Sequence, residues 1–170
     1  MARLAELVAL GYGEPPEKAR QIHTAAVLHD IGKQKIPKSI LEKPDKLTED
    51  EFRVIKTHTT IGAEMLADIQ GELGEMARLI ALYHHEKYNG CGYWGKRTDE
   101  LPAYVAFTAI SDVYTALLCP RPYKRRYSPS EALGYIRHQA GIQFDPKLIA
   151  VFVPLVQHDA RVRDIYKEVM

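Results

Sequence analysis

The sequence predicts an all-α fold, a single helical domain that spans residues 1–170. Apolar residues recur at helical spacing in successive segments, and the punctuation between these segments is that of helix ends rather than hairpins. A chain of 170 residues with 46% hydrophobic and 26% charged residues has the size and composition of one globular domain. The start and stop signals of each helix can then be taken in order.

A helix is predicted to follow Pro15-Pro16, because proline is favoured in the first turn and apolar residues then recur at helical spacing. We expect this helix to end near Gly32. Its apolar stripe consists of Ala19, Ile22, Ala26 and His29. The pattern therefore places His29 on the buried face of the helix.

The next two predicted helices also carry a histidine on an apolar face. The first opens with a capping box, Thr48-Glu49-Asp50-Glu51, and the second stops at the loop Asn89-Gly90-Cys91-Gly92. The inner face of the first consists of Ile55, His58, Gly62 and Met65, and that of the second of Met76, Leu79, Ile80, Tyr83 and His84. Successive helices are therefore expected to point histidines inward.

The segment PAYVAFTAISDVYTALLC, which begins at Pro102, predicts a central helix of about four turns. Asp112 is its only charged residue. An isolated ionised carboxylate is costly to bury in an apolar helix, so Asp112 needs a cation, a metal or several hydrogen-bond donors as its partner.

Two further helices are predicted where an N-cap residue precedes proline, at Ser128 and at Asp145. We expect the first to close at Gly141 and the second to be kinked at Pro154. The alternating charges that follow Asp159 are typical of a solvated terminal helix. No chemistry is assigned to this last part of the chain.

Charge, cysteine content and hydropathy exclude several classes of function. The 23 lysine and arginine residues nearly balance the 22 acidic ones, so the chain has no bulk field for binding a nucleic-acid backbone. Cys91 and Cys119 form neither a disulfide framework nor a CxxC pair, which predicts a reducing compartment and hence the cytoplasm. Every long apolar stretch is broken by charge or histidine, so neither a membrane-spanning helix nor a signal peptide is expected.

Inward histidines and buried carboxylates together predict a metal centre, because imidazole and carboxylate are the ligands of first-row transition metals. Any one of these histidines alone would more often be an ordinary core or surface residue. Their joint placement on four converging helices favours the metal site. The candidate ligands are His29, Asp30, His58, His84, His85 and Asp112.

The charge of this ligand set indicates the reaction. Four neutral histidines and two aspartates contribute −2 against +4 from two divalent ions, and the surplus favours hydroxide and phosphate. A bridging carboxylate, which we expect to be Asp30, would hold two metals about 3.5–4 Å apart, with a shared water that loses a proton to become the nucleophile. The site is therefore suited to phosphodiester hydrolysis.

Six blocks of sequence, in order, resemble one known family. They are AAVLHDIGKQKIP, ILEKPDKLTEDEF, KTHTTIG, HHEKYNGCGYW, ISDVYTALLCPRPYKRRYS, and SPSEAL with FDP. In these blocks, from about Ala25 to Val156, the chain is similar to the HD-GYP domains of the HD superfamily of metal-dependent phosphohydrolases. The resemblance implies an HD-superfamily helical bundle.

The resemblance also implies roles for particular residues. The metal ligands of the family fall on the six candidates given above, and they imply two divalent ions, iron or manganese, with zinc as the alternative. Lys33 matches the lysine that contacts the scissile phosphate, so Asp30 and Lys33 are the expected catalytic residues. Substrate binding is implied for Lys33, for Tyr93 of the GYP loop, and for Arg121 and Lys124 in the RPYK block.

The activity implied is that of a bacterial phosphodiesterase that opens cyclic di-GMP to pGpG and, in many members, to GMP. The alternative is a degenerate HD-GYP module that binds cyclic di-GMP or a signalling partner without turnover. A third reading, hydrolysis of mononucleotides, is disfavoured by the HHE, GYW and RPYK blocks. Family members also contact diguanylate cyclase domains through the GYP loop, which makes these domains the expected protein partner.

Three departures from the family pattern bear on these roles. Trp94 stands where the family has proline, which either weakens or retargets the partner contact or makes Trp94 a partly buried anchor. Thr115 stands where a second aspartate is common. No histidine precedes His23, so the upstream helix that completes the metal site of the family is expected to be missing and the domain to be shortened at its N-terminus. The missing ligand and the GYW loop both favour the degenerate alternative.

Overall fold

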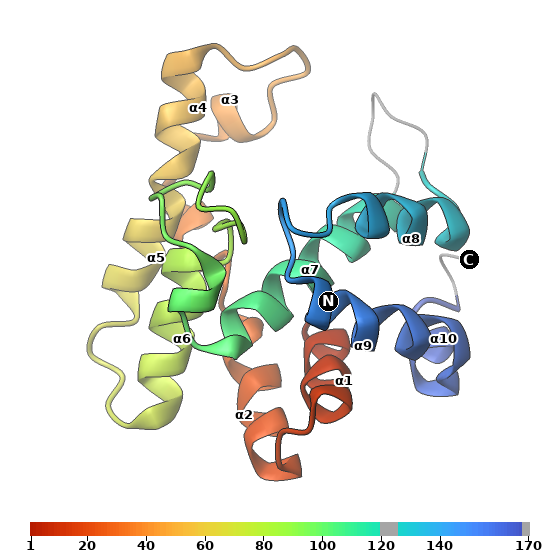
Figure 1. The fold of residues 1–170 in the computed structure, drawn as a ribbon. Coiled ribbons are helices and arrows are strands. Elements are labelled where there is room, and N and C mark those ends of the chain that lie inside the picture. The colour runs from red at the N-terminus through yellow and green to blue at the C-terminus, as the bar shows by residue number, and fades with distance from the viewer. Residues whose placement is uncertain (120–125, 168–170) are drawn as a thin grey trace.

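The computed structural model describes residues 1–119 and 126–167, and over these residues the predicted all-α fold is confirmed (Figure 1). The α-helices are α1 (Ala2–Tyr12), α2 (Pro16–Ala26), α3 (Lys38–Leu41), α4 (Glu49–Lys56), α5 (His58–Met65), α6 (Glu72–Tyr83), α7 (Ala103–Leu118), α8 (Pro129–His138), α9 (Pro146–His158) and α10 (Ala160–Ile165). Two 3₁₀ turns, η1 (Ile31–Lys35) and η2 (Thr98–Glu100), lie between them. Among the described residues, no helix combines the length and apolar character needed to cross a lipid bilayer.

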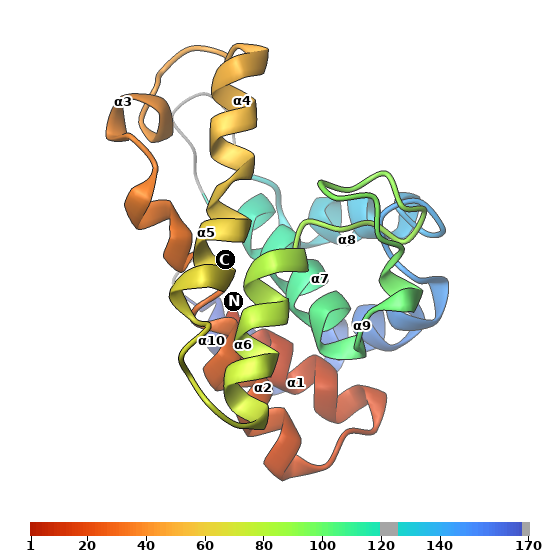
Figure 2. The ribbon, with the colours of Figure 1, turned by 90° about the vertical axis from the view of Figure 1, so that its left-hand side faces the viewer.

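The core is built around α1 and α7. Helix α1 packs against α2, α7 and α9, and its residues Leu4, Leu7 and Val8 are fully buried. Helix α7 contributes Ile110 and Tyr114 to the same apolar cluster and also contacts α6 and α8. The expected central position of α7 is therefore confirmed, and burial of these side chains is the main stabilising term of the fold. Figure 2 shows α7 running between α6 on one side and α8 and α9 on the other.

Helix starts are predicted well because their signals are local. The Thr48/Glu51 and Ser128/Glu131 capping boxes are both formed, with each side chain bonded to the backbone N–H of the other residue. Asp145 caps α9 through the N–H of its second residue.

Helix ends differ from the prediction at several points. The helix expected to reach Gly32 ends at Ala26, so His29 lies in a turn and not on a helical stripe. The helix expected from the Thr48 capping box to Met65 is divided into α4 and α5 at Thr57, and Met65 is 39% exposed, not on an inner face. Helix α8 ends at His138, three residues before Gly141.

Side chains that bond to nearby carbonyls explain the break at Thr57. The hydroxyl of Thr57 donates to the carbonyl of Val54 at 2.7 Å, and Nδ1 of His58 lies 2.6 Å from the carbonyl of Ile55. These bonds occupy carbonyls that a continuous helix would use and so compete with it. The structure therefore has two shorter helices in place of the single predicted helix, and Met65 is the last residue of α5.

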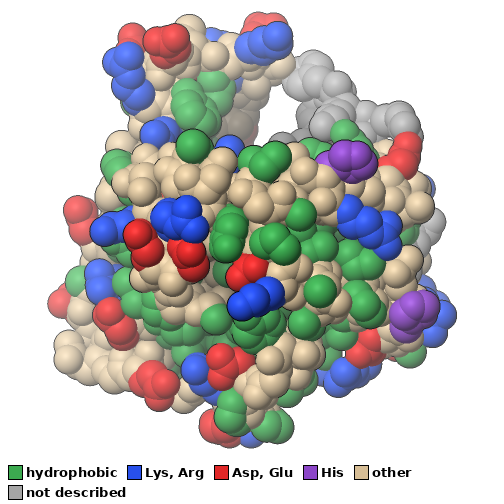
Figure 3. Space-filling model, viewed as in Figure 1, with side chains coloured by type: hydrophobic (Ala, Val, Ile, Leu, Met, Phe, Trp, Pro, Cys, Tyr) green, Lys and Arg blue, Asp and Glu red, His purple; other side chains and the backbone are tan. Residues whose placement is uncertain are grey.

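Helices α3 and α4 form an arm that stands away from the remaining helices in both views (Figures 1 and 2). Neither helix contains a buried residue. Lys43, which follows α3, and Glu51, in α4, form an ion pair in which Nζ lies 2.7 Å from Oε2. Charged side chains of both signs cover its tip in Figure 3.

Gly32 allows the turn that carries Asp30 to pack directly against α5. A Cβ at Gly32 would overlap the carbonyl oxygen of His58 and lie 2.6 Å from the backbone nitrogen of Gly62. Both neighbours are backbone atoms, so no side-chain movement could relieve the overlap. The glycine therefore sets the distance between the turn and the first residues of α5.

We expect Gly32→Ala to lower the free energy of unfolding by about 3 kcal/mol, because the turn must move off α5. Urea denaturation followed by circular dichroism would measure the change. Gly134→Ala, in α8, is the matched control, because its Cβ would meet nothing within 4 Å and alanine favours a helix by about 0.5–1 kcal/mol. Equal unfolding midpoints for Gly32→Ala and the wild type would contradict the prediction.

Candidate metal centre

Four side chains from three parts of the fold converge on one point. Asp30 lies in the turn after α2, His58 begins α5, and His84 and His85 follow α6. One ligand atom of each lies within 4.8 Å of the others. Oδ1 of Asp30 is 3.3 Å from Nε2 of His58 and 3.7 Å from Nε2 of His84. The structure thus brings together four of the six predicted ligands in one group.

Backbone carbonyls orient the histidine rings. The Nδ1 atoms of His29, His58 and His84 lie 2.9, 2.6 and 3.0 Å from the carbonyls of Ala26, Ile55 and Ile80, respectively. A carbonyl only accepts hydrogen bonds, so each Nδ1 carries the ring proton. In the neutral ring the lone pair is then on Nε2, and the Nε2 atoms of all three histidines face Asp30, which is the arrangement of metal-binding histidines.

The pKa values of the buried histidines agree with this neutral form. Burial, together with the neighbouring His84 and His58, lowers the pKa of His85 to about 2. Burial also lowers the pKa of His84. For Asp30, burial acts to raise the pKa, but the close approach of the ring nitrogens of His29, His58 and His84 outweighs burial and holds the pKa below its ordinary value. The site therefore combines the Asp30 carboxylate with neutral imidazoles at His84 and His85.

This donor set fits a divalent cation. Oδ1 of Asp30 is buried and, among the described residues, has no hydrogen-bond partner. Neutral Nε2 lone pairs and a carboxylate oxygen repel one another at these distances unless a cation lies between them. Imidazole nitrogen and carboxylate oxygen are ligands that zinc, iron and manganese accept.

The second carboxylate oxygen of Asp30 faces a different set of groups. Its Oδ2 lies 3.2 Å from Nε2 of His29 and 2.7 Å from Nζ of Lys33. Nε2 of His29 is in turn 3.7 Å from Oδ1 of Asp112, on α7. Burial lowers the pKa of His29, but Asp30, Asp112 and the Ala26 carbonyl together outweigh burial and the net shift is upward. The geometry therefore allows Asp30 to bridge two positions.

Lys33 and Tyr93 each contact one member of this group. Lys33 lies in η1, and its side chain remains 41% exposed beside Asp30. The ring of Tyr93 packs on that of His85, with centroids 4.5 Å apart and planes inclined at 33°. Burial, and then the charge of Asp30, raise the pKa of the Tyr93 hydroxyl. Both side chains therefore lie at the site, and their roles in substrate binding stay predictions.

Trp94 is anchored, although 43% of it is exposed. Its ring nitrogen Nε1 donates to the hydroxyl of Thr59 at 3.0 Å, and its backbone N–H donates to Glu86 at 2.7 Å. Nζ of Lys56 lies 5.7 Å from the Trp94 ring centroid. These contacts support the anchor interpretation of Trp94.

Two predicted substrate-binding residues, Arg121 and Lys124, lie outside the described residues. Thr115 is not a site residue: its hydroxyl is 2.7 Å from the hydroxyl of Tyr166. Glu86 was assigned no role in the sequence analysis, yet it is 2% exposed and binds the loop that carries Tyr93. Its position directly after His84-His85 could have indicated this role, because a carboxylate that is buried needs hydrogen-bond donors.

Comparisons with known proteins agree with this site. The HD domain family matches residues 1–148. The chain is 45% identical over 150 residues to the "Cyclic di-GMP phosphodiesterase response regulator RpfG" of Xanthomonas campestris pv. campestris (strain 8004), covering 88% of this chain and 40% of that protein. It is 36% identical over 154 residues to the "3'3'-cGAMP-specific phosphodiesterase 2" of Vibrio cholerae serotype O1, covering 90% of this chain and 30% of that protein. The chain thus spans less than half the length of these relatives.

A solved structure shows the same fold. Bd1817, an HDGYP protein from Bdellovibrio bacteriovorus, superposes with a TM-score of 0.72 at 19% identity, over 92% of this chain and 50% of that one. The resemblance to HD-GYP proteins is therefore confirmed. With the HD pair at His29-Asp30 and a family match over most of its length, the chain belongs to the HD domain family of metal-dependent hydrolase domains.

Proposed function

We propose that this chain hydrolyses cyclic di-GMP, with pGpG as the first product. One observation carries the proposal: Asp30 Oδ1 and the Nε2 atoms of buried histidines converge within 3.3–3.7 Å, beside the ammonium of Lys33. The name of the X. campestris relative, a cyclic di-GMP phosphodiesterase at 45% identity, supports this substrate.

The candidate ligands form two proposed metal positions. Asp30 Oδ1 with His58, His84 and His85 would hold one divalent ion, and Asp30 Oδ2 with His29 and Asp112 the other. Bound ions of this kind activate a water and neutralise charge on the phosphodiester. Iron or manganese is proposed, with zinc as the alternative, because imidazole and carboxylate suit all three.

The remaining residues act on the substrate. The Lys33 ammonium, held at Asp30 by a 2.7 Å contact, is placed to stabilise negative charge that develops on the phosphate. The Tyr93 ring, packed on His85, offers an aromatic face and a hydroxyl at the edge of the site. Arg121 and Lys124 are proposed to bind substrate phosphates on the resemblance alone.

Turnover of purified protein, loaded with Mn²⁺ or Fe²⁺, would test the substrate. We expect cyclic di-GMP to be consumed with pGpG as the first product, and mononucleotides to remain intact. Binding of cyclic di-GMP without any product would instead establish the degenerate module. Hydrolysis of mononucleotides alone would contradict both.

Hydrolysis of 3'3'-cGAMP is the second candidate function, because the V. cholerae relative at 36% identity carries that specificity in its name. The two cyclic dinucleotides differ in one base, so a competition assay with both in one tube would decide between them. We expect the higher kcat/KM for cyclic di-GMP. A higher value for cGAMP would reassign the substrate.

We also propose a protein partner and a cellular compartment for this chain. A diguanylate cyclase domain is the proposed partner at the GYW loop, where Trp94 is 43% exposed. The cytoplasm is the proposed compartment, which agrees with the two free cysteines, Cys91 and Cys119.

We expect the two metal positions to differ in affinity. The first has four protein ligands, and the side chains of His58 and His84 are 1% and 0% exposed. The second has three, Asp112 is 29% exposed, and the Lys33 ammonium lies near Asp30 Oδ2. Fewer donors, greater exposure and a neighbouring positive charge all weaken cation binding.

Calorimetric titration of metal-stripped protein with Mn²⁺ would measure the difference, and two classes of site are expected. His84→Ala should remove the tight class, while Asp112→Ala should remove only the weak class. Activity of the purified chain should rise when Mn²⁺ is added. Two sites of equal affinity in the wild type would refute this prediction.

A further inference from the structure

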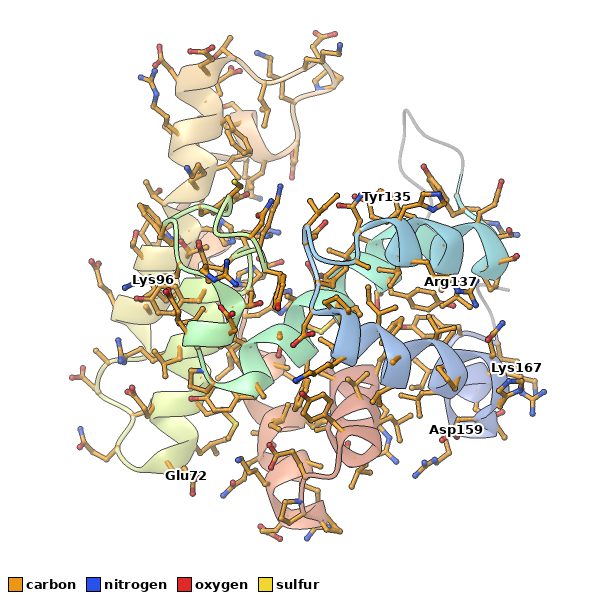
Figure 4. The ribbon with its side chains drawn as sticks, viewed as in Figure 1. Glu72, Lys96, Tyr135, Arg137, Asp159 and Lys167 are labelled. Atoms are coloured by element: carbon orange, nitrogen blue, oxygen red, sulfur yellow. The ribbon has the colours of Figure 1, made fainter. Side chains whose placement is uncertain are left out.

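The buried carboxylate of Glu86 binds the loop between His85 and Arg97. Glu86 is 2% exposed, and its Oε1 and Oε2 accept the backbone N–H groups of Trp94 and Lys96, each at 2.7 Å. Within the described part of the chain, Glu86 forms no ion pair, so backbone donors compensate its burial. Figure 4 shows Lys96 on this loop, on the side of the molecule that carries α5 and α6.

Two glycines adapt the loop to this carboxylate. Gly95 lies between the two donors and has a φ of 78°, a left-handed conformation that favours glycine and brings both N–H groups onto Glu86. Gly92 lies directly on the same residue: a Cβ there would be 2.5 Å from the Glu86 Cα and 2.8 Å from the His85 carbonyl oxygen. The loop therefore has no room to shift toward Glu86.

Both attachment points of the loop adjoin proposed metal ligands. Glu86 follows His85 in the chain, and Thr59, which accepts from the Trp94 ring nitrogen, follows His58. Tyr93 lies between these attachments, and its ring centroid is 4.5 Å from that of His85 and 6.4 Å from that of His58. Fixing the loop thus fixes Tyr93 relative to the histidines.

We propose that Glu86 is a positioning residue, whose carboxylate holds the GYW loop so that Tyr93 presents its ring and hydroxyl to a substrate bound beside His85. The inference that Tyr93 then meets a cyclic dinucleotide rests on the proposed function. The bond from Trp94 N–H to Glu86 exists only because position 94 is not proline, which has no N–H. The GYW sequence therefore gives this loop a backbone attachment that GYP cannot form.

Glu86→Gln tests the carboxylate with little change of shape. An amide has one accepting oxygen, and its NH₂ group would face a backbone N–H donor. Because Trp94 is the only tryptophan in the chain, its fluorescence reports on this loop alone. We expect its emission to shift to longer wavelength and to be quenched more strongly by acrylamide, with helical content and bound metal unchanged.

With cyclic di-GMP, the expected result is a rise in KM of about tenfold with a smaller change in kcat, because a misplaced Tyr93 weakens substrate binding. Glu64→Gln, exposed on α5, is the matched control and should leave fluorescence and KM unchanged. Fluorescence and KM at wild-type values in Glu86→Gln would overturn the proposal.

Gly92→Ala provides a second test that leaves Glu86 intact, because its Cβ would push the loop off the carboxylate. It should reproduce the fluorescence and KM changes, whereas Gly134→Ala, whose Cβ meets nothing within 4 Å, should not. If both loop variants instead lose helical content and bound metal together, Glu86 has a merely structural role and the proposal fails. If the wild type has no turnover, the proposed function fails, and the fluorescence comparison still decides whether Glu86 holds the loop.

Discussion

Replacing Asp30 by alanine is expected to lower metal affinity by about a hundredfold or more and to reduce hydrolysis below detection. Its two oxygens face both proposed metal positions, with Oδ1 3.3 Å from His58 and Oδ2 3.2 Å from His29. The side chain is the one group shared by both positions, so a single substitution should affect both. Helical content should be retained, since Asp30 belongs to a turn outside the apolar core.

Metal content by mass spectrometry, turnover and circular dichroism would be measured on the same preparations. Asp30→Asn separates charge from shape, and we expect it to lose metal as well, because an amide oxygen is a weaker ligand for a divalent cation than a carboxylate. Asp68→Ala, at an exposed position after α5, is the matched control. Normal metal content and turnover in Asp30→Ala would eliminate its bridging role.

Replacing Lys33 by alanine is expected to reduce kcat by about a hundredfold at unchanged metal content. The ammonium lies 2.7 Å from Asp30 Oδ2, but a lysine is a cation and cannot itself be a metal ligand in this form. Its contribution is to the charge on the phosphate, which is larger in the transition state than in the substrate. The loss should therefore fall mainly on kcat and less on KM.

Lys35→Ala is the matched control, because Lys35 lies in the same 3₁₀ turn and is exposed. It should retain wild-type kinetics. Lys33→Arg should recover part of the lost rate, since it restores a positive charge with different geometry. A wild-type rate in Lys33→Ala would show that Lys33 is an ordinary solvated surface residue. Loss of metal in that variant would show instead that Lys33 has a structural role.

Much of the fold could be predicted because its signals are local in sequence. Capping boxes at Thr48 and Ser128 are formed by residues three apart, so tertiary contacts are not needed to specify them. The helix that follows Pro102 has a single charged residue, Asp112, in about four turns, which favours a central position. The helix ends after Ala26 and at Thr57 were not predictable from periodicity, because short side-chain bonds to carbonyls compete with the helix there.

The candidate site was predicted as a set of residue types, and its geometry was not. Histidines at 29, 58, 84 and 85 with Asp30 and Asp112 were expected to converge; the structure groups Asp30, His58, His84 and His85, with His29 beside Asp30 and Asp112 beside His29. The division of Asp30 between two sets of partners depends on how the turn after α2 packs on α5, which Gly32 permits. The role of Glu86 depends on donors eight and ten residues away, across a loop without periodicity.

The sequence by itself determined the all-α class, the helix starts and the family, and it predicted the ligand types, because each depends on residue spacing or local hydrogen bonding. Only the tertiary structure decided which oxygen of Asp30 faces which histidine, and that Glu86 and Thr59 hold the loop carrying Tyr93. The physical reason is that these contacts join segments far apart in the chain. Their distances are set by the packing of α5 and α6 against the turn and loop, which no local pattern encodes.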